Sequence, residues 1–494
     1  MMLWYDETES HHGAMESMAM HLMGVEPTWN TRAQVDGLKL IPDSQMTHPR
    51  VNILFNVSGI YRDGFGDKML LLDRAVRLAA SAGDNPISRQ DKQVKADLIK
   101  AGVDEKKAEV IAKSRVFGNQ PGAYAIGVDR LVEQSQNAGN SRVADLYLHN
   151  MNYAYSNESW GETAPKALEN HFKGNQVALF SRTSNLYGAL DNDDMYSYAG
   201  AMSFASQTVN GGQAPTFYLH NLRKRGGENM VNLKTFLATE LNQRAWNPKW
   251  IDHMKRSGYA GAREMYREVE HLYGFQATTA DSMDGQFWQN TFDVYVADKH
   301  GLELKQFFEK ENPHARQNQL ARLLEVDRQG AYKFNEADRS KLVADYVRSI
   351  NQFGVACSAN ICGNKKVQEY VASVAPLVSG LGSAELRQFG KTLAQATRWN
   401  AKEFANAPKE FREGIQEAAK PRQEVTERRP TPPRPPVPPP PPIVTGRVMK
   451  EKIIKLSQEA ARAALPFAWS QMFALFAIVM LGYFWEGRRT TGVS

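Results

Sequence analysis

The chain is poor in cysteine, with only Cys357 and Cys362 among its 494 residues. Two cysteines exclude a small scaffold held together by disulfides, although they do not fix the redox compartment. The net charge of +6 is low for this length and is not gathered into a basic stripe with interleaved aromatic residues, so we expect no nucleic-acid partner. With 42% hydrophobic and 23% charged residues, the chain is typical of a globular protein of two or three domains.

Several catalytic signatures are also missing. The sequence contains no HExxH, GxSxG or paired CxxC motif. The segment ELRQFGKT ends in the Gly-Lys-Thr of a phosphate-binding loop at residues 390–392, but Glu385 occupies the position where such a loop needs its first glycine. The sequence therefore predicts that this chain does not itself hydrolyse ATP.

The two ends of the chain differ. At the N-terminus, acids and histidines in MMLWYDETESHHG interrupt any apolar run, so we expect no signal peptide. Near the C-terminus, 23 uncharged residues from Ala463 to Trp485 are long enough to cross a hydrocarbon core of ~30 Å. We predict a single-pass membrane anchor in residues 447–494, with the transmembrane helix at about 464–485; a buried core helix is the alternative. More basic residues precede this helix than follow it, which favours a cytoplasmic body.

A proline-rich segment precedes the predicted anchor. Residues 430–442 contain ten prolines in thirteen positions. Such a composition adopts the extended polyproline II conformation and spans roughly 40 Å. We expect a linker over residues 421–446 that holds the body away from a membrane. A ligand for an SH3-type domain is the alternative, because the PxxP pattern is present.

The body begins with a strand pattern followed by a helix pattern. The apolar run VNILFNVSG ends in small residues, and the helical segment DKMLLLDRAVRLAASAG follows it and ends at Gly83. Beyond residue 100 helical patterns dominate. In WNPKWIDHMKRSG, Asn247 can cap a helix that Gly258 ends, and a second helix is predicted from 262 to 274. We expect a helix-rich mixed α/β fold: an α/β unit at the N-terminus followed by a mainly helical region to residue 365, a helical extension over 366–420, the proline-rich linker and one C-terminal transmembrane helix.

The stretch LDNDDMYSYAG places Asp191, Asn192, Asp193 and Asp194 in a row. Their oxygen atoms can bind a hard metal ion, but an EF-hand loop is excluded because no glycine occupies its sixth position and Met202 replaces its final glutamate. Alternatively, the stretch begins a helix, with Asp193 or Asp194 capping the first turn.

Five motifs occur in a fixed order along the chain: NVSGIYRD, SRVFGNQPGAYAIGV, LDNDDMYSY, NPKWIDHMKRSGYAGAREM and GFQATTADSMD. The opening segment LWYDETESHHGAMESMAMHLMGVEPTW precedes them. Together, over about residues 2–350, they resemble the C-terminal part of the large tetrapyrrole-binding chelatase subunits, cobaltochelatase CobN and the H subunit of magnesium chelatase.

This family inserts a divalent metal into a corrin or porphyrin ring, driven by ATP hydrolysis in separate AAA+ and von Willebrand-type subunits. For this chain the resemblance implies a tetrapyrrole and a divalent metal as substrates, cobalt first and magnesium or iron as alternatives. ATP and Mg²⁺ would be used by the partner subunits and not by this chain. The family's large subunits are much longer, so we expect an N-terminal CobN-like chain to complete the subunit, which would be inactive without its partners.

The resemblance also implies site residues. As catalytic residues that take the protons of the pyrrole nitrogens we predict Asp191, Asp193, Asp194 and Asp63. As ring-binding residues we predict Arg62, Tyr124, Trp250 and Trp288, and as metal ligands Asp193, His149 and His253. For Arg62 an internal ion pair with Asp63 is the alternative. Trp250 can instead serve packing, and each histidine can be structural or merely exposed.

The chain departs from the family in places. SRTSNLYGAL precedes the acidic stretch where CobN-type sequences have a histidine and charged residues, and Gln289 and Asn290 replace acids, although Asp284 remains. The segment GVACSANICGN resembles a cysteine-rich region of some membrane-linked relatives, with fewer ligands. Two thiols make an incomplete metal site, so we expect Cys357 and Cys362 to be free and buried.

Two other functions stay open. Membrane-anchored CobN-like proteins include haem dechelatases, which remove iron from haem outside the cytoplasm, and this alternative requires an extracytoplasmic body. The other alternative is a non-enzymatic tetrapyrrole carrier tethered to the membrane. A carrier would bind the ring without any change of metal and would be indifferent to Asp193→Ala.

Overall fold

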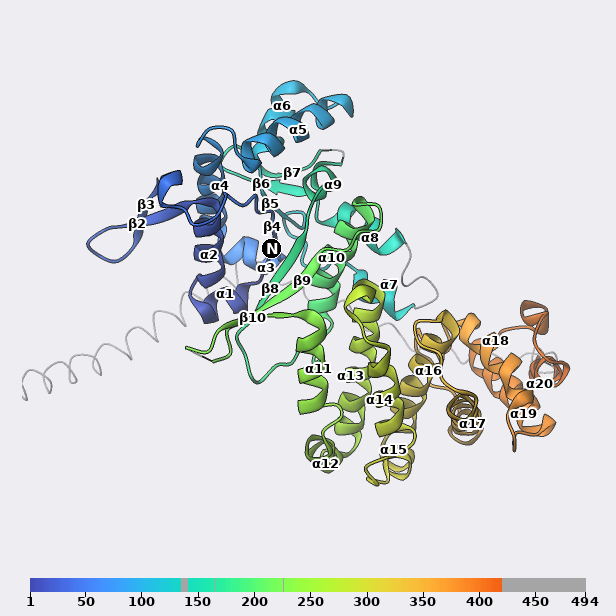
Figure 1. Cartoon of the computed structure of the whole chain (residues 1–494). Coiled ribbons are helices and arrows are strands. Elements are labelled where there is room, and N and C mark those ends of the chain that lie inside the picture. The colour runs from blue at the N-terminus through green and yellow to red at the C-terminus, as the bar shows by residue number, and fades with distance from the viewer. Residues whose placement is uncertain (135–140, 165, 225, 420–494) are drawn as a thin grey trace, which may run out of the picture. The chain divides into compact units, whose positions relative to one another are not determined.

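The computed structural model describes residues 1–134, 141–164, 166–224 and 226–419, which fall within one compact unit, Met1–Val425 (Figure 1). Within these ranges the strands lie between residues 2 and 232, and the residues from 233 onward form helices. The helix-rich mixed α/β fold is therefore confirmed for this part of the chain. The predicted linker and transmembrane helix lie outside the described residues. None of the described helices is both long and apolar enough to cross a membrane.

A five-stranded sheet forms the centre of the N-terminal part. Its strands, in spatial order, are β1 (Met2–Leu3), β4 (Phe55–Val57), β5 (Val116–Gly118), β6 (Tyr153–Tyr155) and β7 (Trp160–Glu162). The first three strands are parallel and the last two pair antiparallel, with Phe55 opposite Val116. Because β4 and β5 are parallel, the helices between them form a crossover. This confirms the α/β unit expected from VNILFNVSG.

Two smaller sheets accompany the five-stranded sheet. β8 (Val177–Arg182) pairs parallel with β9 (Thr216–Asn221), which pairs antiparallel with β10 (Asn229–Asn232), and β2 (Val25–Trp29) forms a hairpin with β3 (Val35–Leu40). Helices still predominate between residues 100 and 232, as predicted, but the strands β5 to β10 in this region were not foreseen. Buried strands as short as three residues, such as VFG in β5, carry no alternating pattern that a sequence can reveal.

Short helices cover these sheets. They are α1 (Tyr5–His11), α2 (Ala14–Met23), α3 (Gly59–Gly64), α4 (Gly66–Ala80), α5 (Pro86–Lys100), α6 (Glu105–Lys113), α7 (Val128–Glu133), α8 (Ser141–Asn150), α9 (Ala167–Phe172) and α10 (Ala201–Val209), with a π-helical turn η3 (Tyr196–Gly200) before α10 and a 3-10 turn η1 (Asp43–Gln45). A π-helical turn is rare and occurs frequently at functional sites.

The helical part follows. It contains α11 (Leu233–Gln243), α12 (Pro248–Arg256), α13 (Gly258–Thr278), α14 (Gly285–Tyr295), α15 (Leu304–Glu311), α16 (Pro313–Gln329), α17 (Glu336–Phe353), α18 (Lys365–Val374), α19 (Ser383–Thr397) and α20 (Lys409–Ala419), with short 3-10 turns η4 (Ala280–Ser282), η5 (Ala375–Leu377) and η6 (Ala401–Phe404). Asn247 caps α12 as predicted, its side chain accepting from the Lys249 N–H at 2.9 Å. α13 continues through Gly274 rather than ending there. A Cβ at Gly274 would lie 2.4 Å from the Tyr196 ring, so this glycine permits close packing.

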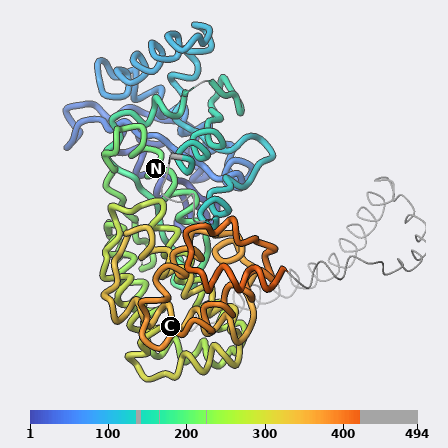
Figure 2. Tube along the Cα trace, turned by 90° about the vertical axis from the view of Figure 1, so that its right-hand side faces the viewer, coloured from blue at the N-terminus to red at the C-terminus, as the bar shows by residue number. Residues whose placement is uncertain are grey.

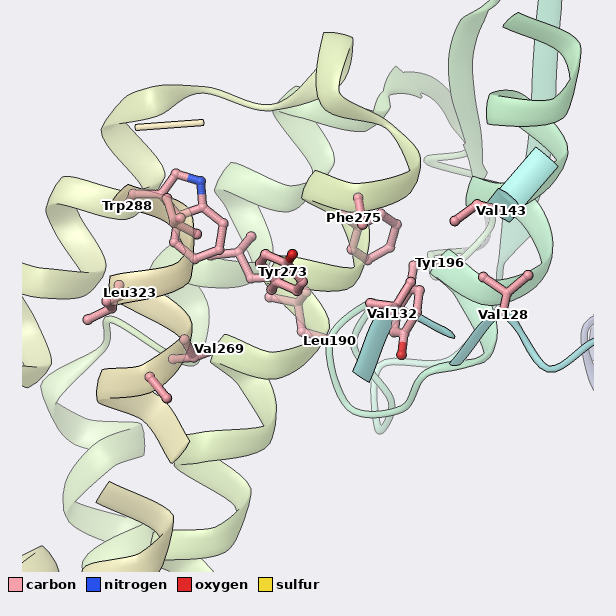
Figure 3. Packing of buried hydrophobic residues seen from close by; sticks show 14 of the residues in the cluster. Val128, Val132, Val143, Leu190, Tyr196, Val269, Tyr273, Phe275, Trp288 and Leu323 are labelled. Carbon is pink, nitrogen blue, oxygen red and sulfur yellow. The ribbon is translucent and has the colours of Figure 1, made fainter. Parts of the chain in front are cut away.

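The hydrophobic core is continuous from the sheet into the helical part. One cluster lies around β4 and α4, and a larger one runs from β5 through α13 to α20. Figure 3 shows part of the larger cluster, around Tyr196 and Tyr273. In Figure 2 the orange helices α18–α20 lie beside the yellow helices that precede them. Tyr346 of α17 packs edge-to-face on Phe389 of α19 at 6.0 Å, so the core crosses the predicted boundary at residue 365.

The two cysteines correct a prediction. Cys357 and Cys362 are joined in a disulfide, with their Cα atoms 4.9 Å apart, so they are not free. The loop between α17 and α18 turns back on itself and brings the two side chains together. The Ala356 N–H donates to Gln317 of α16 at 2.8 Å and the Ser358 hydroxyl donates to Asn318 at 2.5 Å, which fixes this loop. Sequence separation alone did not reveal this turn.

Candidate functional site

The motif NVSGIYRD places an arginine under a neighbouring loop. Ser58 ends the β4 segment and caps α3, accepting from the Tyr61 N–H at 3.2 Å. Arg62 is 2% exposed. Its guanidinium donates to Asp63 Oδ1 at 2.7 Å and to three main-chain carbonyls in the loop after β5, at residues 119, 120 and 123, at 3.1, 2.7 and 3.3 Å. Arg62 therefore fixes this loop against α3.

Asp63 and Tyr124 lie at the surface beside the buried arginine. The Tyr124 hydroxyl donates to Asp63 Oδ2 at 2.6 Å, and Tyr124 is 55% exposed. Hydrogen bonds from Arg62 and from Tyr124 lower the pKa of Asp63. The internal ion pair named as the alternative for Arg62 is thus present, and a carboxylate with a lowered pKa is a poor proton acceptor.

In the acidic stretch, Asp191 holds the preceding loop. Its Oδ2 accepts from the Gly188 N–H at 2.6 Å and from Arg244 Nη1 at 2.5 Å. Burial opposes ionisation of Asp191, but the bonds from Gly188, Glu268 and Arg244 outweigh burial and lower its pKa. Asp191 therefore has a structural role, because its carboxylate already binds the Gly188 N–H and Arg244.

Asp193 and Asp194 begin the helical segment that contains the π-helical turn. The first hydrogen bond of this segment runs from the Ser197 N–H to the Asp193 carbonyl oxygen at 3.0 Å. The carboxylates do not cap, which corrects that alternative: Asp194 Oδ2 accepts from Asn192 Nδ2 at 2.8 Å. Burial and the adjacent Asp193 raise the pKa of Asp194 to about 6.

Further acids from distant segments act on the stretch. Asp129 of α7 and Asp6 of α1 raise the pKa of Asp194, against a larger opposing effect of Arg182, which lowers it. Asp129 also raises the pKa of Glu133 on α7, after the larger contributions of burial and Glu270. Asp129 was not predicted, because it directly follows the motif SRVFGNQPGAYAIGV, which ends at Val128. Asp6 lies in the opening segment WYDETES, whose acidic residues were a usable signal for a further site residue.

Aromatic contacts join the segments. The Tyr198 hydroxyl donates to the main-chain carbonyl of Tyr124, and the Trp4 ring packs edge-to-face on Tyr198 at 4.7 Å. Trp4, Arg182, Asn192, Asp194 and Tyr198 line a cavity of ≈ 20 Å³. A cavity of this size holds about one water molecule. A large ligand must therefore lie over the site rather than within this cavity.

The end of α13, in GFQATTADSMD, supports the same turn. Figure 3 shows Tyr196 beside Val132 of α7 and Phe275 of α13, and the rings of Tyr196 and Phe275 are 6.2 Å apart. A Cβ at Gly200 would lie 2.5 Å from Thr278 Oγ1, so the two backbones approach closely. Four of the five motifs and the opening segment thus meet at one place.

Buried groups of α13 support the stretch and were not predicted. The His271 Nδ1–H donates to the Leu190 carbonyl at 2.5 Å, and burial lowers the pKa of His271. Burial and the nearby Asp191 raise the pKa of Glu268. The segment EVEH was a usable signal, since it places three ionisable groups within an otherwise largely apolar helix.

The remaining predicted residues are not brought to this place. Trp288 is 0% exposed and its Nε1–H donates to Gln276 Oε1 at 2.9 Å, which corrects its predicted contact with a ring. Trp250 packs against the helical core from α12. His149 and His253 are exposed, and the helices that carry them, α8 and α12, lie well apart in Figure 1. Among the residues that the structure describes, no group of three His, Cys, Asp or Glu side chains could hold a metal ion.

Comparisons with known proteins agree with the convergence of these motifs. Residues 1–339 match the model of the family described as CobN/Magnesium Chelatase. The chain is 30% identical over 346 residues to the aerobic cobaltochelatase protein CobN of Pseudomonas aeruginosa, covering 69% of this chain and 27% of that protein. It is 27% identical over 339 residues to the H subunit of the magnesium chelatase of Chlorobaculum parvum, covering 68% and 26%.

A solved structure is similar as well. The catalytic subunit of cobaltochelatase from Mycobacterium tuberculosis matches with a TM-score of 0.64 and 25% sequence identity, covering 70% of this chain and 29% of that one. The chain therefore spans between a quarter and three tenths of the length of these relatives.

Proposed function

The chain belongs to the CobN/magnesium chelatase family, and on that premise we propose that it is the C-terminal part of a chelatase subunit that acts on a tetrapyrrole and a divalent metal. The observation that carries the proposal is the convergence of four family motifs and the opening segment around the helical turn that directly follows Asp193 and Asp194. Within the described part of the chain, these two carboxylates are neither paired with an arginine nor used as helix caps.

Metal insertion requires two proton transfers. A free-base ring carries two pyrrole N–H groups, and both protons must leave when a divalent cation takes their place. In our proposal Asp194 and Asp193 accept these protons. A carboxylate whose pKa is raised to about 6 is still largely ionised at neutral pH and holds an accepted proton better than an exposed aspartate does. Asp191 and Asp63 instead act as positioning residues, because their oxygens already accept hydrogen bonds from arginines.

The energy for insertion would come from other chains. The sequence has no phosphate-binding loop, so we propose that AAA+ and von Willebrand-type partner subunits hydrolyse ATP. Cobalt is our first choice of metal, with magnesium or iron as alternatives. Because the chain spans only 27% of the CobN relative's length, we propose that an N-terminal CobN-like chain supplies the rest of the subunit.

We further propose a membrane tether. Residues 464–485 are apolar and uncharged and follow the proline-rich segment. A transmembrane helix there would hold the body at the membrane. The excess of basic residues before that helix favours a body on the cytoplasmic side.

One observation favours a second candidate function, removal of iron from haem outside the cytoplasm. The Cys357–Cys362 disulfide is of a kind that persists in oxidising compartments and is rare in the cytosol. A body outside the cytoplasm could not use a cytosolic ATPase, so this candidate differs from the first in both location and partners.

Isolation of the full-length protein from its native membrane in mild detergent tests both candidates. Co-purifying chains and any ring are identified by mass spectrometry and absorbance. An N-terminal CobN-like chain, AAA+ subunits and a metal-free ring would support insertion. Haem without an ATPase, together with an intact disulfide after thiol alkylation, would support iron removal. Recovery of neither a ring nor a chelatase partner would contradict both.

A further inference from the structure

The loop between β8 and the acidic stretch, residues 183–190, exposes two large apolar side chains. Leu186 is 84% exposed and Tyr187 is 60% exposed, and they are adjacent in sequence. Scattered exposed apolar residues need no explanation, but a neighbouring pair beside a functional site does. We refer to residues 183–190 as the platform loop.

Two arginines of neighbouring elements hold the platform loop by its main chain. Arg244 Nη2 donates to the carbonyl oxygens of Asn185 and Leu186 at 3.2 and 3.1 Å, and Arg223 Nη2 donates to that of Tyr187 at 3.2 Å. The tip is therefore fixed at three successive carbonyl groups. Loops of this length without a ligand are usually among the mobile parts of a protein.

Two carboxylates hold the end of the platform loop nearest the site. The Gly188 N–H donates to Asp191 at 2.6 Å, and the Ala189 N–H donates to Glu240 at 3.1 Å. A Cβ at Gly188 would lie 2.5 Å from Glu240 Oε2, so a side chain here would have to displace that carboxylate.

The same charged groups neutralise one another beneath the loop. Arg244 pairs with Asp191, and Arg223 pairs with Glu240 at 2.5 Å. Arg182, which lines the small cavity with Asp194, donates to the Gly188 carbonyl at 2.7 Å. The platform loop is thus connected to Asp194 through one side chain.

From this geometry we propose that Leu186 and Tyr187 form a rigid surface against which one face of a planar aromatic macrocycle packs, beside Asp193 and Asp194. This inference rests on the proposed function and deepens it, since it states where the ring lies. A ring held on this surface stays outside the cavity, which is too small for it. Tyr187 can stack on the ring because aromatic groups prefer offset-stacked contacts, and Leu186 adds apolar area.

The rigidity gives the surface its function. Ligand binding to a loop that arginines already hold in place costs less conformational entropy than binding that must first order the loop. The exposed side chains contribute little to the stability of the free protein, because surface substitutions away from special features usually change it only slightly. Replacing them should therefore affect ring binding without unfolding the chain.

Ring affinity of matched variants tests the inference. The full-length chain is isolated in mild detergent with any partner subunits that co-purify, and metal-free protoporphyrin IX is titrated while its absorbance and fluorescence are followed. We expect Leu186→Ala combined with Tyr187→Ala to raise the dissociation constant about tenfold or more. Tyr187→Phe should keep wild-type affinity, because stacking does not need the hydroxyl group.

Two residues of the same types and similar exposure provide the control. Leu377 is 78% exposed and Tyr259 is 64% exposed. Leu377→Ala combined with Tyr259→Ala should leave the dissociation constant unchanged. If the wild type binds the ring and both double variants bind equally well, the platform is refuted while the proposed function stands. If the wild type does not bind protoporphyrin IX, the inference fails, whereas the proposed function, which also admits a corrin, is decided by the co-purification experiment above.

Discussion

Buried carboxylates have different partners in the helical part and at the acidic stretch. In the helical part, Arg322 of α16 is 0% exposed and pairs with Glu270 of α13 through both carboxylate oxygens, with Nε–Oε2 at 2.6 Å. Tyr266 also donates to Glu270, at 3.0 Å. At the acidic stretch, Asp194 has a neighbouring carboxylate and, among the described residues, accepts only from the neutral Asn192.

This difference distinguishes a buried charge that has a structural role from one that has a chemical role. A buried ion pair with every oxygen satisfied fixes two helices relative to each other, whereas an acid placed among other acids reduces stability. A protein retains such an arrangement where a perturbed group has a chemical task. The surplus of acids around Asp194 is thus a better guide to the site than the number of charges buried.

The largest expected effect comes from breaking the paired charges. Glu270→Gln leaves the guanidinium of Arg322 buried without a counter-charge, and we expect the free energy of unfolding to fall by about 3–5 kcal/mol. Chemical denaturation measures this change. The control is Asp252→Asn, which breaks the exposed pair with Arg256 on α12, where the effect should stay below about 1 kcal/mol. Equal losses of unfolding free energy in Glu270→Gln and Asp252→Asn would show that the buried ion pair matters no more than the exposed one.

At the acidic stretch we expect a substitution to raise the free energy of unfolding rather than to lower it. In the folded state the pKa of Asp194 is raised to about 6, above the ordinary aspartate value of 3.8. The protonated form is therefore favoured by folding, and wild-type stability falls as the pH rises from about 4 through 6. Asp194→Asn removes that penalty, so at pH 7.5 the variant should be more stable by about 1–3 kcal/mol, with no gain near pH 4. Denaturation at both pH values measures this, and lower stability of the variant at pH 7.5 would contradict it.

A smaller loss is expected at the disulfide loop. Cys357→Ser opens a loop with a sequence separation of 5, and loop-closure entropy predicts a loss of about 2 kcal/mol of stability. Addition of a reductant to the wild type should give the same thermal shift and should not change the variant. A wild type that is insensitive to reductant would show that the bond contributes nothing to stability.

The smallest effect is expected on α12. His253 is exposed, and His253→Ala should change the free energy of unfolding by less than about 0.5 kcal/mol. We expect metal incorporation to be unchanged as well, because the site lies elsewhere. A loss of incorporation with unchanged stability would restore the predicted metal-ligand role of this histidine.

Part of the fold was predictable because the signals were local. The strand before Gly59 and the cap at Asn247 depend on neighbouring residues, and both were correct. The three-residue strands β5, β6 and β7 were not predictable, because strands this short have no periodicity of their own. Gly274 misled for a related reason: its role is to admit the Tyr196 ring, a contact between segments distant in sequence.

The site was predictable only in outline. Ordered motifs indicated which segments matter, but they did not distinguish carboxylates held by arginines from those that are not. Asp191 and Asp193 are two positions apart, yet only Asp191 meets Arg244, which comes from the end of α11. Trp288 had the residue type expected of a ring contact, and its burial depends on the packing of α14, which the motif does not encode.

The most direct test of the central claim is the rate of metal incorporation by the full-length chain, isolated in mild detergent with any partner subunits that co-purify and supplied with metal-free ring, divalent metal and ATP. Our account predicts that Asp194→Asn slows incorporation by about 10²-fold, the range for loss of a general base, while ring affinity stays within about threefold and His253→Ala has no effect. An unchanged rate in Asp194→Asn, with the ring still bound, would contradict the assignment of the acidic stretch as the proton acceptor.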